Sequence, residues 1–136
     1  MTLIHWTDEM SVGVKAMDDD HKKLIGILNE MKSSLESADD LKAFGVALEQ
    51  LVEYTRIHLA REEKLLAYAN YPESTEHHKE HDEMIDKALK AQANFRCGAT
   101  DMLAAEMTDF LQDWHMNHIL ISDKMYGPHL NEHGIS

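Results

Sequence analysis

The sequence predicts an all-α protein: an antiparallel, up-down four-helix bundle with a short N-terminal arm, formed by a single domain over residues 1–136. Apolar residues recur at helical spacing in four long stretches, and no stretch alternates in the way of a strand. Only 2 prolines and 6 glycines interrupt the chain. Because the connections between these stretches are short, consecutive helices should run in opposite directions.

The arm is expected over about residues 1–17, where Gly13 argues against a regular helix. The first helix is expected over about 18–37, because the acidic run at Asp18–Asp20 suits a helix N-terminus. Residues 37–40 then form the first turn. The second helix, over about 41–69, ends at Asn70-Tyr71-Pro72, since proline cannot continue a helix.

The third helix is expected over about 74–95, before the break at Cys97-Gly98. Thr100 can cap the fourth helix, which should run over about 100–126. Gly127-Pro128 is expected to end this helix and to leave residues 127–136 as a tail.

Composition excludes several classes of partner. The chain carries 25 acidic and 13 basic residues, a formal net charge of −12, which repels nucleic acid and anionic lipid. No apolar run approaches the roughly 20 residues that span a bilayer. The single cysteine, Cys97, cannot form an internal disulfide, and no signal peptide is recognisable at the N-terminus, so a cytoplasmic protein is expected. A monomer is expected rather than an oligomer.

The 10 histidines point to a metal site, because their spacing fits helical ligand pairs. His58 and Glu62 are four residues apart, as are His77 and His81, so each pair shares a helix face, about 40° apart. The other two helices contribute the remaining candidates, and together these form a set of five imidazoles and two carboxylates: His21, His58, Glu62, His77, His81, His118 and Asp123. Such a donor set suits a pair of iron ions inside a bundle.

One spacing does not fit a regular helix. His118 and Asp123 are five residues apart, which places them about 140° apart on an α-helix. If both side chains face the metals, the helix must deviate locally, as in a π-type turn near Ile121-Ser122.

Several segments, spread along essentially the whole chain, resemble the hemerythrin family. The short arm is similar to that of the family's bacterial branch. The segments that carry the resemblance are Trp6 with Ser11-Val12-Gly13-Val14, Asp18-Asp19-Asp20-His21-Lys22, His58-Leu59-Ala60-Arg61-Glu62-Glu63, Tyr71-Pro72 with His77 and His81, and Trp114-His115-Met116-Asn117-His118-Ile119 with Asp123-Lys124.

The resemblance implies a role for each ligand and a function. His77, His81 and His118 would saturate one iron, and His21 and His58 would bind the other and leave a position open. Glu62 and Asp123 would bridge the two irons together with an oxo or hydroxo group. Dioxygen would bind end-on at the open iron. The expected function is reversible dioxygen binding for delivery, storage or sensing, and not catalysis.

Spacing and the family likeness also suggest an oxygen pocket formed by Leu24, Leu59, Trp114, His115 and Ile119. Leu59 stands where the family often has phenylalanine, and His115 stands where it usually has leucine. We hypothesise that His115 contacts bound oxygen or ligates iron, and that it shortens the life of the oxygenated form; for this residue, packing in the core with its hydrogen bonds satisfied is the other interpretation. The alternative is a di-iron enzyme acting on peroxide or nitric oxide, with His115 as the acid/base. A purely structural or iron-moving bundle is disfavoured, because the chain lacks the Glu-x-x-His motif of ferritin-like proteins.

Overall fold

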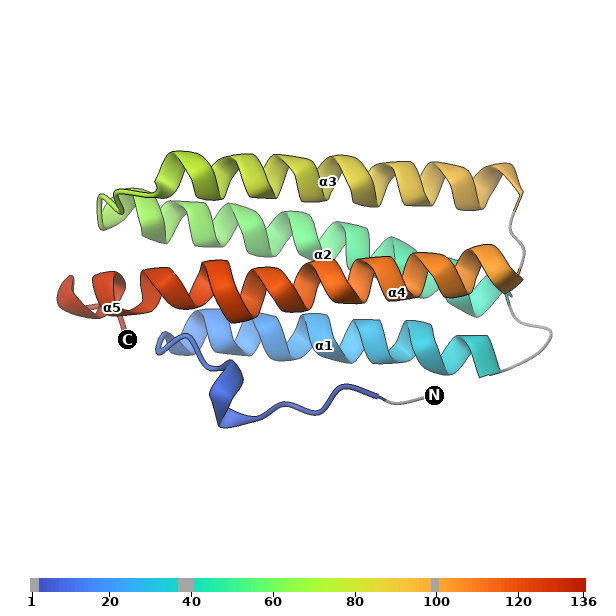
Figure 1. The fold of residues 1–136 in the computed structure, drawn as a ribbon, viewed down its shortest axis with the longest axis horizontal. Helices are drawn as coiled ribbons and strands as arrows, with labels where there is room; N and C mark the ends of the chain where they lie inside the picture. The colour runs from blue at the N-terminus through green and yellow to red at the C-terminus, as the bar shows by residue number, and fades with distance from the viewer. Residues whose placement is uncertain (1–2, 37–40, 99–100) are drawn as a thin grey trace.

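The computed structural model describes residues 3–36, 41–98 and 101–136. Four helical rods run antiparallel to one another in chain order, and no strand occurs within these residues (Figure 1). The prediction of an all-α four-helix bundle is therefore confirmed. The fourth rod is continuous through three helical segments, and the arm contains one turn of 3₁₀-helix. The elements are η1 Asp8–Met10, α1 Lys15–Glu36, α2 Leu41–Tyr68, α3 Ser74–Cys97, α4 Asp101–Asn117, the π-helix η2 His118–Asp123 and α5 Lys124–Glu132.

The first helix begins earlier than expected. α1 starts at Lys15 and not at Asp18, because Gly13 takes a φ of 79° and turns the chain into the helix there. The Asp18 carboxylate accepts hydrogen bonds from the Ser11 hydroxyl at 2.5 Å and from the Val12 N–H at 2.8 Å. Asp18 thus ties the arm to the helix instead of marking its start. The predicted turn at residues 37–40 and the Thr100 cap lie outside the described residues.

The predicted end of the fourth helix at Gly127-Pro128 is wrong. α5 runs through both residues to Glu132, so the predicted tail is mostly helical. Tyr126 and Leu130 on this helix are buried against Val12 and Val14 of the arm. This apolar contact stabilises the helical turn that contains the proline. The contact joins residues far apart in the sequence, so a prediction from neighbouring residues does not include it.

Gly127 is required where the arm crosses α5. A Cβ at this position would lie 2.1 Å from the carbonyl oxygen of Val12, a backbone atom that cannot move alone. We expect Gly127→Ala to lower the free energy of unfolding by roughly 1–3 kcal/mol, as overpacking does. Chemical denaturation measures this change. Gly26→Ala in the middle of α1 is the matched control, because a Cβ there meets no described atom within 4 Å, and it should stabilise the protein slightly. Equal stability of Gly127→Ala and wild type would contradict this account of the arm.

Two apolar clusters leave a polar layer between them. The larger cluster joins all four long helices and includes Leu28, Leu51, Met84 and Leu111. The smaller cluster lies under the arm and includes Met17, Leu66, Tyr126 and Leu130. On α1, α2 and the fourth rod the predicted ligands fall between residues of the two clusters. On α3 they lie between Tyr71, just before the helix, and Met84, so the fold places all of the ligands in one layer of the bundle. None of the described helices is long and apolar enough to cross a membrane.

Candidate metal centre

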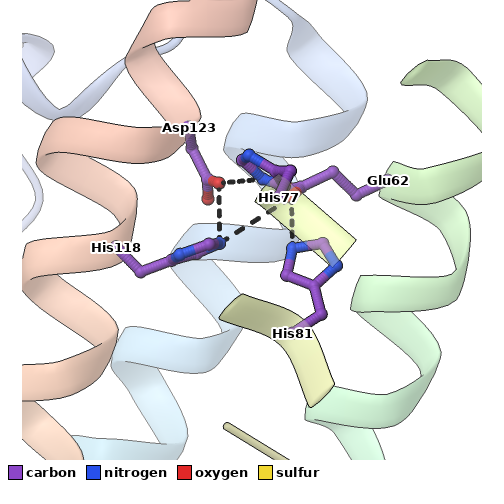
Figure 2. Close-up of side chains that lie close together, drawn as sticks. All are labelled: Glu62, His77, His81, His118 and Asp123. Atoms are coloured by element: carbon purple, nitrogen blue, oxygen red, sulfur yellow. Dashed lines mark hydrogen bonds and ion pairs between the residues drawn. The ribbon is translucent and has the colours of Figure 1, made fainter. Parts of the chain in front are cut away.

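The seven predicted ligand residues converge from all four rods, and all of them are buried. His21 comes from α1, and η2 contributes His118 and Asp123. The ligand atoms form two groups, within each of which all atoms lie within 4.8 Å of one another. One group is Glu62, His77, His81, His118 and Asp123, and the other is His21, His58, Glu62 and Asp123. Figure 2 shows the three imidazoles of the first group turned toward the two carboxylates.

Glu62 presents one oxygen to each group. Its Oε1 lies 2.6 Å from His77 Nε2 and 2.9 Å from His81 Nε2. Its Oε2 lies 3.2 Å from His58 Nε2 and accepts a hydrogen bond of 2.9 Å from the buried Tyr126 hydroxyl. The two oxygens of one carboxylate therefore face two separate sets of imidazoles, and Tyr126 fixes the carboxylate's orientation.

Asp123 is divided in the same way. Its Oδ1 lies 2.9 Å from His118 Nε2 and 3.0 Å from His77 Nε2, whereas its Oδ2 lies 3.0 Å from His21 Nε2. Both Asp123 oxygens, His21 Nε2 and His118 Nε2 make no hydrogen bond within the described part of the chain. Buried polar atoms without hydrogen bonds are costly, so this arrangement fits residues whose partners are metal ions.

The π-helix brings His118 and Asp123 to one face. η2 spans these two residues, so the predicted local deviation at Ile121-Ser122 is confirmed. In a π-helix the hydrogen-bonded turn closes between residues five apart, which aligns a pair that a regular α-helix would splay. π-type turns of this kind are frequently found at functional sites.

Carboxylates also hold the outer nitrogens of three of these histidines. His58 Nδ1 lies 2.9 Å from Asp20, His118 Nδ1 lies 2.9 Å from Glu80, and His81 Nδ1 lies 3.2 Å from Glu63. A carboxylate at Nδ1 keeps the proton on that nitrogen and leaves the Nε2 lone pair for a metal. These residues were not predicted from the sequence, where Asp20 fits a helix N-terminus. The available signal was a carboxylate next to a predicted ligand: Asp20 precedes His21, Glu80 precedes His81, and Glu63 follows Glu62.

The carboxylates also change which groups hold protons. Burial by itself lowers the pKa of His58 and His77, but hydrogen bonds to neighbouring carboxylates outweigh it and raise both to about 9. Burial is likewise outweighed at His118, where the Asp123 charge raises the pKa to about 10. Burial opposes ionisation of Glu62 and Asp123 too, yet the surrounding imidazoles lower the pKa of both. Bound metal cations would take the place of these protons.

The predicted pocket residues surround the ligands in different ways. Leu24, Leu59 and Ile119 are buried, as an apolar lining requires. The Trp114 ring stacks on the His118 imidazole with 4.9 Å between centroids and 16° between planes. Trp114 is only partly buried, so it covers the outer face of a ligand ring.

His115 is buried, but neither of its nitrogens is free. Nδ1 lies 2.7 Å from the Leu111 carbonyl oxygen, and Nε2 lies 3.2 Å from the Thr55 hydroxyl. Burial lowers the pKa of His115 to about 4, so the ring is neutral at pH 7. A neutral imidazole with two occupied nitrogens lacks the proton and the free lone pair that a direct acid/base or ligand role needs. Thr55 was not predicted from the sequence, because it fits an ordinary core position of its helix.

Comparison with known proteins places these features in a family. Residues 12–130 match the family model described as the hemerythrin HHE cation binding domain. The chain is 29% identical over 136 residues to a bacteriohemerythrin of Stenotrophomonas maltophilia (strain R551-3), covering 98% of this chain and 85% of that protein. It is 30% identical over 132 residues to a bacteriohemerythrin of Methylococcus capsulatus (strain ATCC 33009 / NCIMB 11132 / Bath), covering 96% and 99%.

The likeness extends to a solved structure. A crystal structure of wild-type hemerythrin superposes with a TM-score of 0.83 at 28% identity, over 95% of this chain and 98% of that one. The family model covers most of the chain and includes every residue of the two ligand groups. This chain therefore belongs to the hemerythrin family.

Proposed function

We propose that this chain binds dioxygen reversibly at a non-haem di-iron centre. The observation that carries the proposal is the division of two buried carboxylates between two sets of imidazoles. Glu62 and Asp123 each direct one oxygen to His77 and its neighbours and the other to His21 or His58. That geometry suits two cations joined by two bridging carboxylates, and the nitrogen and oxygen donors suit iron.

Under this proposal, His77, His81 and His118 hold one iron, and His21 and His58 hold the other. Glu62 and Asp123 would bridge the pair, together with an oxo or hydroxo group. The second iron has one histidine fewer, which leaves a position for an exchangeable ligand. When bound, the two irons would supply one electron each, which is the two-electron chemistry that reversible dioxygen binding needs.

The surrounding residues favour binding over catalysis. Leu24, Leu59 and Ile119 are buried and limit the access of water. The one N–H proton of the neutral His115 is already donated to the Leu111 carbonyl and is not offered to a bound ligand. Dry surroundings of this kind help a dioxygen complex to dissociate without side reactions. We propose delivery, storage or sensing of dioxygen as the role.

We also propose that the protein is a cytoplasmic monomer, which agrees with the single cysteine and the high net charge of −12.

Iron analysis together with absorption spectra tests the proposal. The purified protein should contain about two irons per chain, and the reduced protein should gain a visible absorption band under air that disappears when oxygen is removed. One metal per chain, or a spectrum that does not respond to oxygen, would rule the proposal out. Titration of the reduced protein with dioxygen would then give the number of molecules bound.

His115 should shorten the life of the oxygenated protein. The hydrogen-bonded pair of His115 and Thr55 puts polar atoms in an otherwise apolar region near the ligands, and polar groups retain water and protons that promote oxidation. We expect His115→Leu to slow autoxidation roughly fivefold, the scale of one hydrogen bond. Decay of the visible band under air measures the rate. The hypothesis fails if the leucine variant, with its iron retained, oxidises as fast as wild type or faster.

A further inference from the structure

A hydrogen bond crosses the interior of the bundle between Thr55 and His115. Thr55 lies on α2 and His115 on α4, and both side chains are at most 3% exposed. α1 packs mainly against α2 and α4, and α3 packs against the same two helices, so α2 and α4 face each other across a diagonal of the bundle (Figure 1). A bond of 3.2 Å between their side chains therefore passes through the bundle interior, near its axis.

This pair lies one helical turn from the metal centre. Thr55 precedes His58 by three residues, and His115 precedes His118 by three. α2 and α4 run in the same direction, so the pair closes one end of the ligand layer. Tyr126 closes the other end, because it follows Asp123 by three residues and donates its hydroxyl proton to Glu62.

The direction of each hydrogen bond follows from its partners. The Leu111 carbonyl oxygen can only accept, so His115 Nδ1 carries the proton and donates it at 2.7 Å. The ring is neutral, because burial lowers its pKa to about 4, and Nε2 is therefore an acceptor. The Thr55 hydroxyl must donate its proton to Nε2, which leaves only lone pairs on the Thr55 oxygen for any other neighbour.

We propose that the Thr55–His115 pair forms the floor of the exchangeable-ligand position and makes it select against bare anions. His115 is the positioning residue: it holds the Thr55 proton away from the centre, so the oxygen of Thr55 offers lone pairs to a bound ligand. A ligand that is a bare anion, such as azide, meets no donor there and is repelled. This inference rests on the proposed function, because it assigns ligand selectivity to the same centre.

Azide binding to single and double variants of the pair tests the inference. In His115→Leu the Thr55 hydroxyl is released and can donate to the anion, so the azide Kd of the oxidised iron-loaded protein should fall about three- to tenfold. In the double variant His115→Leu with Thr55→Val, that gain should disappear, since no hydroxyl remains. Thr55→Ser keeps the hydroxyl and should leave the azide Kd within about twofold of wild type. Thr108→Val is the matched control, because Thr108 is also buried but donates to the Ala104 carbonyl of its own helix.

Nitrogen-15 NMR of histidine-labelled protein gives a second readout that does not depend on ligand binding. It should show His115 protonated at Nδ1 and not at Nε2. The inference is overturned if His115→Leu binds azide no more tightly than Thr108→Val, if the gain persists in the double variant, or if Nε2 carries the proton. Absence of iron or of an oxygen-dependent band would instead refute the proposed function. The NMR result would still decide the orientation of the pair.

Discussion

Replacing Glu62 by glutamine is expected to destroy the binuclear centre, so that the purified variant holds at most one iron per chain. Oε1 and Oε2 of Glu62 face the two separate groups of imidazoles, and glutamine keeps only one oxygen. Its NH₂ group cannot donate a lone pair to a metal. Changing a residue that only supports a ligand costs roughly 10- to 100-fold in metal affinity, and loss of a bridging oxygen should exceed that range.

The neighbouring residue supplies the control for this prediction. Among the described residues, Glu63 forms ion pairs with the outer nitrogen of His81 at 3.2 Å and with the exposed His78 at 2.6 Å. Glu63→Gln removes the same charge from the same helix, yet it should retain two irons and lose no more than about 10- to 100-fold in affinity. Iron content after dialysis against a weak chelator compares the two variants. Two firmly held irons in Glu62→Gln would show that this carboxylate does not bridge.

The sequence predicts the helices but not all of their ends. Apolar stripes and Pro72 are local features, and they are enough to place α2 and α3 within two residues. The ends at Lys15 and beyond Gly127-Pro128 depend on contact between the arm and α5. That contact joins the two ends of the chain, so no window of sequence contains it.

The candidate site shows the same division. The pairs His58/Glu62 and His77/His81 could be predicted because i, i+4 spacing is a local property, and the five-residue spacing of His118 and Asp123 predicts the π-helix. Asp20, Thr55 and Tyr126 were missed because their partners lie 38, 60 and 64 residues away. Hydrogen bonds between helices depend on their packing, which spacing within one helix does not give.

The melting temperature of the metal-free protein should fall as the pH rises from about 6.5 to 10, whereas metal binding should strengthen over the same range. The pKa values of His58 and His77 are about 9 and that of His118 is about 10, all above the unfolded value of 6.5. Their contribution to stability is complete below pH 6.5 and is lost as the pH rises through 9 to 10. Glu62 and Asp123 have lowered pKa values, so their contribution is present above about pH 4.5 and is lost in acid. Chelator-treated protein should therefore melt at the highest temperature between about pH 4.5 and 6.5.

Iron reverses this dependence, because each imidazole must lose a proton before it can bind a metal. The difference in Tm between iron-loaded and metal-free protein should widen steadily from about pH 5 to about pH 9. Binding at pH 7 should release protons, since His58, His77 and His118 hold them at that pH in the metal-free state. Calorimetric titration in two buffers of different ionisation enthalpy counts the protons released. Asp20→Asn should reduce that count, because Asp20 helps to raise the pKa of His58. Two results would contradict this account: a Tm difference that narrows toward pH 9, or binding without proton release. Either one would mean that the imidazoles are already deprotonated before the metal binds, so the carboxylates do not keep them charged.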